Sequence, residues 1–261
     1  MRIAVIGDIH ANLPALLAVL ADVELIGCDA VYCVGDVVGR GPHPNQVVEE
    51  LARRDVPAVQ GNWDEAVGME REHSGATWSS RDAEAAGQAS LAWTITAMSE
   101  ENRGWLRTLP PTLRLNLAGR TGLFFHGSPL RQSEYLWAER PSRTFARIAS
   151  DEGDDLFCFG HTHEAFHRVV GPSHFVAAGS VGCGTGGDPR AKYAIVYIGQ
   201  PEVAVGFRSV EFDMAAVLCD MVDANLPIEL LRVPPRPHLP AGHVAAHPFA
   251  PGDVPRAPGA L

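Results

Sequence analysis

The chain has 261 residues, 46% of them hydrophobic, so it is long enough to bury the core of one sizeable globular domain. Its 31 acidic and 21 basic residues give a formal charge of −10, which argues against a surface that binds duplex nucleic acid. Five cysteines at irregular spacing argue against a disulfide framework, and neither a membrane span nor a signal peptide is visible, so we expect a cytoplasmic protein without a membrane partner.

Strands and helices alternate at the start of the chain. An apolar strand is predicted at residues 3–6 and a helix at 13–25, and the same pair recurs as a strand at 30–34 and a helix at 45–54. A third strand is predicted at 56–60. Such strand–helix units favour a mainly parallel, buried sheet and an α/β fold.

The composition changes after this point. Ala, Glu, Gln, Arg and Ser dominate residues 65–110, which predicts a helical insertion or cap. Strands follow as a hairpin at 112–117 and 121–125, and then, in a half that looks more antiparallel, at 156–159, 167–170, 174–178, 193–198 and 203–210, with helices at 142–150 and 214–225. We expect residues 1–232 to form one domain and the Pro/Ala/Gly-rich tail, 233–261, to be extended or disordered.

Five apolar segments end in residues that commonly bind metal ions. These residues are Asp8 with His10, Asp36, Asn62, His126, and His161 with His163. Any one of them alone is weak evidence, because carboxylates often cap helices and His-x-His pairs are often incidental. The ordered set favours a metal site of oxygen and imidazole ligands, which suits Mn²⁺, Fe, Zn²⁺, Ni²⁺ or Mg²⁺. Asp36 is central to the set and therefore suited to bridge two ions.

In this order and context the set resembles the calcineurin-like metallophosphoesterase superfamily. Smaller motifs are similar to its compact prokaryotic phosphodiesterase branch, among them Gly39-x-Gly41-Pro42, His126-Gly127-Ser128-Pro129 and Gly179-Ser180-Val181-Gly182. The resemblance covers about residues 1–210. It implies an α/β fold in which a two-sheet β-sandwich is flanked by helices.

The resemblance also implies two divalent metal ions, with manganese expected first and Fe, Zn, Ni or Mg as alternatives. Asp8, His10 and His163 would hold one ion, Asn62, His126 and His161 would hold the other, and Asp36 would bridge them. The implied reaction is hydrolysis of a small phosphodiester substrate by a hydroxide between the metals, with Asp36, Asn62, His126 and Asp64 in catalytic roles. The two ions would attract phosphate even though the chain is acidic.

One position departs from the family pattern. Many relatives carry histidine directly after the Asn ligand, whereas this chain has Trp63, whose indole cannot transfer a proton at neutral pH. Losing a general acid typically costs about 10²- to 10⁴-fold in rate, which favours diesters or activated esters over alkyl monoesters. Asp64, which orients that histidine in relatives, is expected here to cap a helix. His43 and His73 are alternative proton donors, although a solvated surface position explains each more simply.

Four further side chains are candidates to touch the substrate. Trp63 could stack on a nucleobase, although packing at the cleft wall is the simpler interpretation. Arg190, which follows a Gly-rich loop, is the first candidate for a phosphate contact, and Arg40 and Arg131 are others. Ordinary surface pairing is an equally open interpretation for all three arginines.

Two alternative functions stay open. The first is a catalytically weak or silent scaffold for protein partners, as in the retromer subunit that shares this fold. Trp63 favours that alternative, whereas the complete set of seven ligands opposes it. The second is a hydrolase of nucleotides or dinucleoside polyphosphates, which would predict a base-binding pocket in the helical insertion. The sequence also leaves open whether the protein forms a homo-oligomer.

Overall fold

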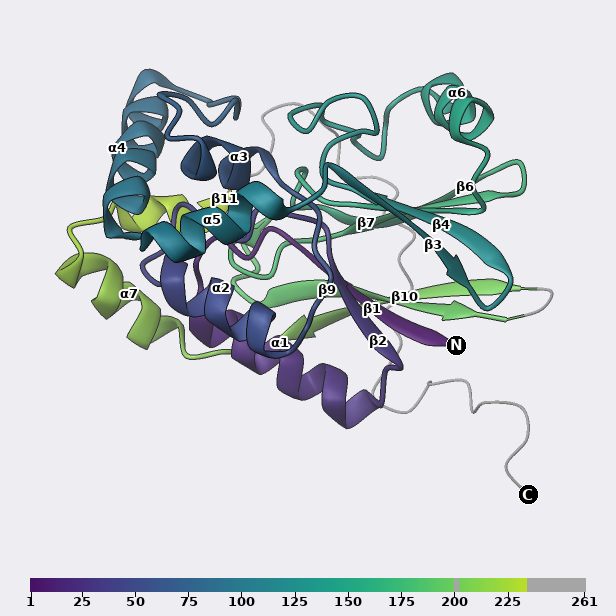
Figure 1. Ribbon diagram of the computed structural model, residues 1–261, viewed down its shortest axis with the longest axis horizontal. Coiled ribbons are helices and arrows are strands. Elements are labelled where there is room, and N and C mark those ends of the chain that lie inside the picture. The colour runs from purple at the N-terminus through teal and green to yellow at the C-terminus, as the bar shows by residue number, and fades with distance from the viewer. Residues whose placement is uncertain (200–201, 234–261) are drawn as a thin grey trace.

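Two β-sheets are stacked face to face in the computed structural model, which describes residues 1–199 and 202–233 (Figure 1). The first sheet has the order β10 (Val203–Val210), β9 (Ala191–Ile198), β1 (Arg2–Ile6) and β2 (Ala30–Cys33). The second has the order β3 (Thr112–Leu117), β4 (Arg120–Phe125), β5 (Leu156–Phe159), β7 (Ser173–Ala178) and β6 (Ala165–Val170). A short pair, β8 (Gly184–Thr185) with β11 (Arg232–Val233), lies apart from both sheets.

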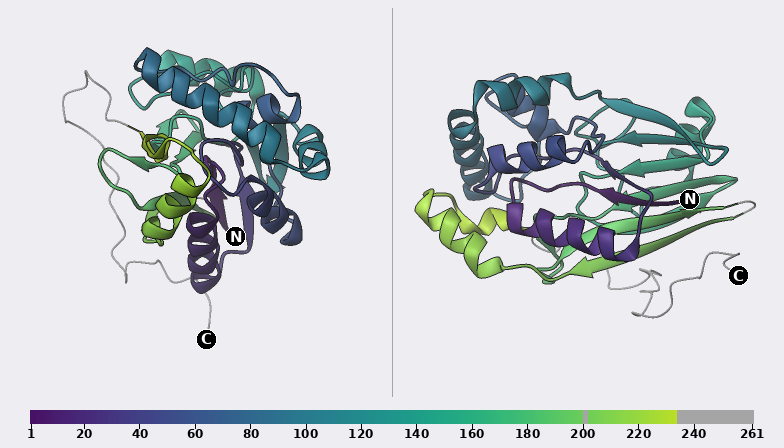
Figure 2. Two further views of the ribbon diagram at one scale, coloured as in Figure 1. Left: turned by 90° about the vertical axis from the view of Figure 1, so that its left-hand side faces the viewer. Right: turned by 60° about the horizontal axis from the view of Figure 1, so that its bottom comes forward.

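Helices cover the outer faces of the two sheets, so the layers run helix, sheet, sheet, helix (Figure 2). The first sheet is covered by α1 (Leu13–Ile26) and α2 (Pro44–Arg53), and the second by α6 (Ser142–Glu152). At the end of the sandwich where β1 and β2 finish lie α3 (Asn62–Gly68), α4 (Arg81–Ala97) and α5 (Glu100–Thr108). The chain continues through α7 (Met214–Asp223) and the 3₁₀ turn η1 (Ile228–Leu231).

Side-chain alternation along β1 explains how this sandwich is filled. Ile3 and Val5 point between the two sheets, whereas Ala4 and Ile6 point toward the helices, because successive side chains of a strand face opposite ways. All four side chains are fully buried. A strand with both faces covered reads as a continuous apolar run, which is the pattern that the sequence shows.

The expected fold class, a two-sheet α/β sandwich flanked by helices, is confirmed. The predicted strand at 56–60 is wrong as a regular strand, because only Ala58 forms a bridge, with Cys33, and Pro57 has no N–H to continue a ladder. The second half is more antiparallel, as expected, since β6 pairs antiparallel with β7 and β9 with β10, although β7 pairs in parallel with β5. The region 65–110 is helical apart from its connecting loops.

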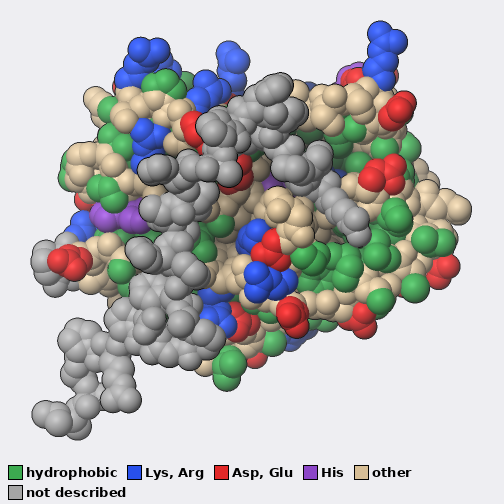
Figure 3. All heavy atoms as spheres, turned by 180° about the vertical axis from the view of Figure 1, so that it is seen from behind, with side chains coloured by type: hydrophobic (Ala, Val, Ile, Leu, Met, Phe, Trp, Pro, Cys, Tyr) green, Lys and Arg blue, Asp and Glu red, His purple; other side chains and the backbone are tan. Residues whose placement is uncertain are grey.

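The tail prediction falls almost wholly outside the described residues, which end at Val233. Within residues 1–199 and 202–233 no helix is long and apolar enough to cross a membrane. On the face shown in Figure 3, acidic and basic side chains lie interspersed. The expectations about localisation, oligomeric state and nucleic acid stay predictions.

Candidate metal centre

The seven side chains predicted as metal ligands lie together at one end of the sandwich. They follow β1, β2, β4 and β5 or begin α3, and each is at most 5% exposed: Asp8, His10, Asp36, Asn62, His126, His161 and His163. Backbone hydrogen bonds join the loops that carry them, from Asp8 N–H to the Gly35 carbonyl at 2.9 Å and from Gly160 N–H to the His126 carbonyl at 3.0 Å. The strand ends therefore present these side chains to a common buried space.

Unusual backbone conformations concentrate at this site. The angle φ is 49° at Asp8, 49° at His10, 52° at Asp36, 67° at His161 and 59° at His163. These values lie in the left-handed region, which residues other than glycine rarely adopt and which costs free energy. Such strain persists only where the surrounding structure holds it, and it is typical of functional sites.

A first group of ligand atoms consists of Asp36, His126 and His161, which lie within 4.8 Å of one another. The Nε2 atom of His126 lies 3.3 Å from Oδ2 of Asp36 and 3.2 Å from Nδ1 of His161. The side-chain oxygen of Asn62 lies 3.1 Å from the same Nε2 atom, so it adds a fourth donor to the group.

A second group consists of Asp8, His10 and Asp36, again within 4.8 Å. His10 Nε2 lies 3.7 Å from Asp36 Oδ2 and 3.1 Å from His163 Nε2. His163 Nε2 in turn lies 3.3 Å from Asp8 Oδ1. Asp36 thus belongs to both groups, and its carboxylate is the feature that they share.

Backbone carbonyls fix which atoms of these ligands face the site. Nδ1 of His126 donates to the carbonyl of Val34 at 2.7 Å, and Nδ1 of His10 lies 3.3 Å from the carbonyl of Val38. A carbonyl only accepts, so Nδ1 carries a proton in each ring, and Nε2 is the ring atom that faces the site. Asn62 donates its amide to the carbonyl of Ser74 at 2.7 Å, which leaves its oxygen toward the ligand group. Such outer contacts are typical of metal ligands.

The charge state of the site also fits bound cations. Burial lowers the pKa of His161 to about 3, so this ring is neutral. Burial alone would lower the pKa of His126 and His163, but the carboxylates of Asp36 and Asp8 outweigh it and raise both pKa values to about 9. Without metal, the two imidazolium rings therefore offset the charges of Asp36 and Asp8. Divalent ions can replace those protons, because metal binding to histidine releases them.

One donor was missed by the sequence analysis, which had taken the site to lack a thiol. Cys183 is 2% exposed, and its sulfur lies within 4.8 Å of the ligand atoms of His10 and His163. The signal for it was its place directly after the motif Gly179-Ser180-Val181-Gly182. The donor set of this site fits divalent ions, and it includes a thiol at one side.

Asp64 holds the central loop in place. Its carboxylate accepts the backbone N–H of Gly61 at 2.9 Å, which caps α3 as expected, and also those of Val37 at 2.8 Å and Val38 at 3.1 Å. Asp64 is fully buried. It therefore ties the start of α3 to the loop that carries Asp36, while its catalytic role stays a prediction.

Trp63 contributes to the site through its backbone. Its N–H donates to Asp36 Oδ1 at 2.9 Å, a contact that any residue other than proline can make. The indole is 1% exposed and packs edge-on against His10 at 5.9 Å and Trp78 at 6.3 Å between ring centroids. Core packing covers the indole, so Trp63 has no accessible ring face on which a nucleobase could stack.

The structure separates the arginine candidates. Arg40 lies over the rings of Trp63 and Trp78, at 5.8 and 5.4 Å from their centroids. Burial is the largest cause that lowers the pKa of His10, and the positive charge of Arg40 is the second, so Arg40 lies close to the site. Arg190 instead holds Asp188 at 2.9 and 3.0 Å, and none of its bonds within the described ranges reaches the seven ligands. Of these two residues, Arg40 therefore contacts the aromatic rings beside His10, whereas Arg190 is paired on an exposed turn.

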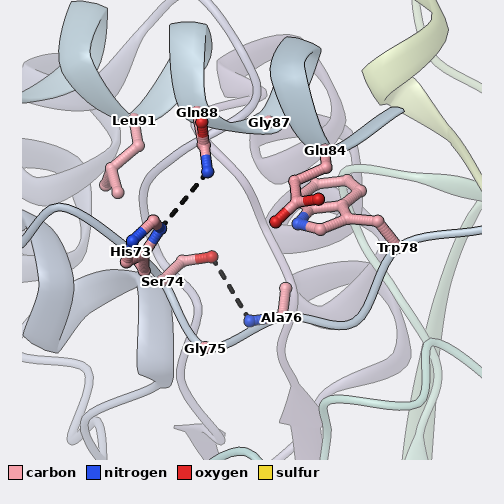
Figure 4. Close-up of a pocket in the computed structure, with 9 residues that line it drawn as sticks. All are labelled: His73, Ser74, Gly75, Ala76, Trp78, Glu84, Gly87, Gln88 and Leu91. Carbon is pink, nitrogen blue, oxygen red and sulfur yellow. Dashed lines mark hydrogen bonds between the residues drawn. The ribbon is translucent and has the colours of Figure 1, made fainter. Parts of the chain in front are cut away.

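A loop of the helical insertion contacts one of the ligands and Tyr135. Its residue Ser74 holds Asn62, as described above, and Thr77 N–H donates to the hydroxyl of Tyr135 at 3.3 Å. Between this loop and α4 lies a hollow of about 140 Å³, lined by Ser74 and Trp78 among others (Figure 4). Tyr135, which the sequence analysis missed, lies with its ring centroid 4.0 Å from that of His161.

The alternative proton donors make contacts elsewhere. His43 Nε2 lies 2.9 Å from Oδ2 of Asp220 on α7. His73 is exposed and lies 3.3 Å from the side chain of Gln88 at the hollow in Figure 4. The exposure of His73 agrees with the simpler interpretation of a solvated surface residue. His43 differs from it, because its side chain is only 15% exposed and is paired with Asp220.

Comparison with known proteins decides the family. The family model for the calcineurin-like phosphoesterase superfamily domain matches residues 1–200. The chain belongs to this superfamily. A metallophosphoesterase from Sphaerobacter thermophilus is similar to this calcineurin-like phosphoesterase over 88% of this chain and 96% of that one, with 29% identity and a TM-score of 0.69.

Two archaeal proteins are also similar to this calcineurin-like phosphoesterase. An uncharacterized protein of Methanocaldococcus jannaschii is 30% identical over 243 residues, which cover 86% of this chain and 93% of that protein. A hypothetical protein of Pyrococcus horikoshii OT3 shares the fold, with a TM-score of 0.75 and 22% identity over 88% of this chain and 96% of that one. The superfamily that the motifs predicted is confirmed, and it indicates a hydrolase of phosphoesters.

Proposed function

We propose that this calcineurin-like phosphoesterase is a metal-dependent phosphodiesterase that works with two divalent ions. The observation that carries the proposal is the shared carboxylate of Asp36, which belongs to both groups of ligand atoms. Asp8, His10 and His163 would hold one ion, and Asn62, His126 and His161 the other. When bound, such ions attract phosphate oxygens and make a nucleophile available from water at neutral pH.

Arg40 is the residue we assign to the substrate phosphate. No carboxylate lies within ion-pair distance of its guanidinium in the described part of the chain, although the chain as a whole is acidic. The faces of Trp63 and Trp78 hold the cation by cation–π contacts. A guanidinium placed in this way can donate to a phosphate oxygen and offset the charge that grows on it during displacement.

The leaving group receives no proton from position 63. The indole of Trp63 is buried and does not exchange a proton at neutral pH, so a departing alkoxide is not neutralised there. Leaving groups that are already acidic, such as phenols, need little help. This supports diesters with a good leaving group as the preferred substrates and alkyl monoesters as poor ones.

Manganese is the first ion to test, and zinc and iron follow closely. The thiol of Cys183 lies beside His10 and His163, and sulfur donors favour zinc or iron over magnesium. The oxygen and imidazole donors of the remaining ligands suit manganese as well. A preference for zinc or iron over magnesium would therefore indicate that the thiol of Cys183 binds the ion.

The experiment compares hydrolysis of bis(p-nitrophenyl) phosphate with that of p-nitrophenyl phosphate, with Mn²⁺, Ni²⁺, Zn²⁺ or Mg²⁺ added. We expect diester turnover that exceeds monoester turnover and that disappears in Asp36→Asn. Asp223→Asn, an exposed carboxylate at the end of α7, is the matched control and should keep the activity. Absence of turnover with every ion would overturn the proposal and favour a scaffold that binds protein partners.

A further inference from the structure

A hollow of about 540 Å³ lies beside the metal centre, lined by the loop between β4 and α6 and by Arg147 of α6. We call it the arginine hollow. Its lining includes Arg131, Glu134, Tyr135, Trp137, Arg140 and Arg147. Tyr135 connects it to the metal centre, because the same ring lies 4.0 Å from the ring of His161.

The arginine hollow is basic within an acidic protein. Three arginines line it against one glutamate, whereas the chain carries a formal charge of −10. No carboxylate within residues 1–199 and 202–233 forms an ion pair with Arg131 or Arg140, and Arg147 has only a long contact of 3.8 Å with Asp151. Elsewhere arginines are bound more tightly, as Arg208 is to Asp22 at 2.6 Å. The cations of the hollow are therefore available to an anion from solution.

Hydrogen bonds fix the wall that carries these cations. Arg140 donates from Nε to the carbonyl of Tyr135 at 3.2 Å. Arg168 of β6 donates to the carbonyls of Ala138 at 2.8 Å and Arg140 at 2.6 Å, which anchors the end of the loop. The ring of Tyr135 stacks on Trp137 at 4.9 Å and 8°. A wall held in this way loses little conformational entropy when a ligand binds.

We propose that the arginine hollow binds a second phosphate group of the substrate. The inference rests on the proposed function, because the phosphodiester to be cleaved must lie at the metal centre while the other phosphate reaches the hollow. Guanidinium groups bind phosphate through two parallel hydrogen bonds, which suits a doubly charged monoester better than a neutral group. The substrate class is thus a phosphodiester in which the alcohol that keeps the phosphate after cleavage also carries a phosphomonoester. An example is a nucleoside 3′,5′-bisphosphate whose 5′-phosphate is esterified with the leaving alcohol.

The test compares thymidine 5′-(p-nitrophenyl phosphate) with the same ester that bears a 3′-phosphate. We expect kcat/KM of the wild-type protein to be about tenfold higher for the 3′-phosphorylated ester, the effect of one charge-assisted contact. In the double variant Arg131→Gln/Arg140→Gln this ratio should fall to near one. Arg143→Gln, an exposed arginine of α6 that does not line the hollow, is the matched control and should keep the ratio. A ratio near one in the wild type, or an unchanged ratio in the double variant, overturns the inference.

A binding measurement separates this inference from the proposed function. If bis(p-nitrophenyl) phosphate is not hydrolysed, the proposed function has failed, and calorimetric titration with thymidine 3′,5′-bisphosphate then tests the hollow without turnover. Binding that is about tenfold weaker in Arg131→Gln/Arg140→Gln than in Arg143→Gln supports the hollow as a phosphate site. Equal binding in the two variants, or none in the wild type, overturns it.

Discussion

The indole of Trp63 packs directly on the backbone of Gly39, where an added Cβ would lie 2.2 Å from the ring atom Cε3. Gly39 also has φ of 85°, in the left-handed region that favours glycine. The next residue is Arg40, whose guanidinium lies over the same indole. The tryptophan that replaces the usual histidine therefore packs on the loop that carries Arg40, the residue we assign to the substrate phosphate.

Gly39→Ala should destabilise the protein strongly. The new methyl group meets the buried ring and the backbone angle becomes strained, so we expect the free energy of unfolding to fall by about 2–4 kcal/mol. Gly171→Ala is the control, because Gly171 also has positive φ, 58°, but nothing lies within 4 Å of an added Cβ. It should cost only about 1 kcal/mol. Urea unfolding measures both, and equal losses would show that the contact with Trp63 is not tight.

Arg40→Gln should lower kcat/KM for bis(p-nitrophenyl) phosphate by about 10- to 100-fold, because the substrate phosphate loses a charge-assisted hydrogen bond. Arg190→Gln should change it less than about twofold, because that guanidinium is bound to Asp188 on an exposed turn. Metal content and thermal unfolding of both variants check that the fold persists. A larger loss of kcat/KM in Arg190→Gln than in Arg40→Gln would assign the phosphate contact to Arg190 instead.

Divalent metal should stabilise the folded protein. Ligand-linked stabilisation at 100 times Kd is about 2.7 kcal/mol, which for a chain of this size raises Tm by about 5–10 °C. Thermal unfolding with Mn²⁺ and with a chelator measures the shift. Asp36→Asn should lose most of it, because Asp36 belongs to both groups of ligand atoms. A full shift in that variant would place the bound ions elsewhere.

Acid should destabilise the protein through a histidine pair that is not among the metal ligands. His167 and His174, on neighbouring strands, stack at 5.2 Å with Nε2 and Nδ1 atoms 3.0 Å apart. Burial, and then the charge of His174, lowers the pKa of His167 to about 4. Burial and Arg120 lower the pKa of His174, while Asp155 raises it. The stability that depends on neutral rings is present above pH 6.5, the ordinary histidine pKa, and is lost as pH falls toward 4.

The double variant His167→Gln/His174→Gln should therefore lose less stability than the wild type between pH 7.5 and 5. We expect the difference to be about 1–2 kcal/mol after allowance for the partial exposure of both rings. Urea unfolding at the two pH values, with chelator present, measures it. Equal losses in the two proteins would assign the acid sensitivity to other groups.

The sequence by itself predicted seven side chains that lie together at the site. His126 directly follows β4, Asp8 and His161 follow β1 and β5 after one intervening residue, and Asp36 follows β2 after two. Such short links to the strands place all four side chains at the sheet edge. Strand and helix periodicity likewise predicted most elements. The segment 56–60 was predicted to be a strand because its side chains are apolar. It forms only one bridge, because Pro57 lacks the N–H that a regular ladder needs.

Only the tertiary structure decided what surrounds the ligands. The burial of Trp63, the choice of Arg40 over Arg190, and the approach of Tyr135 and Cys183 to the histidines all depend on packing between segments far apart in the chain. Local pattern carries no information about such contacts, because the distance between two loops is set by the elements that separate them. The sequence of a strand therefore fixes which side chains lie at its end, and the packing of the other elements fixes which residues those side chains contact.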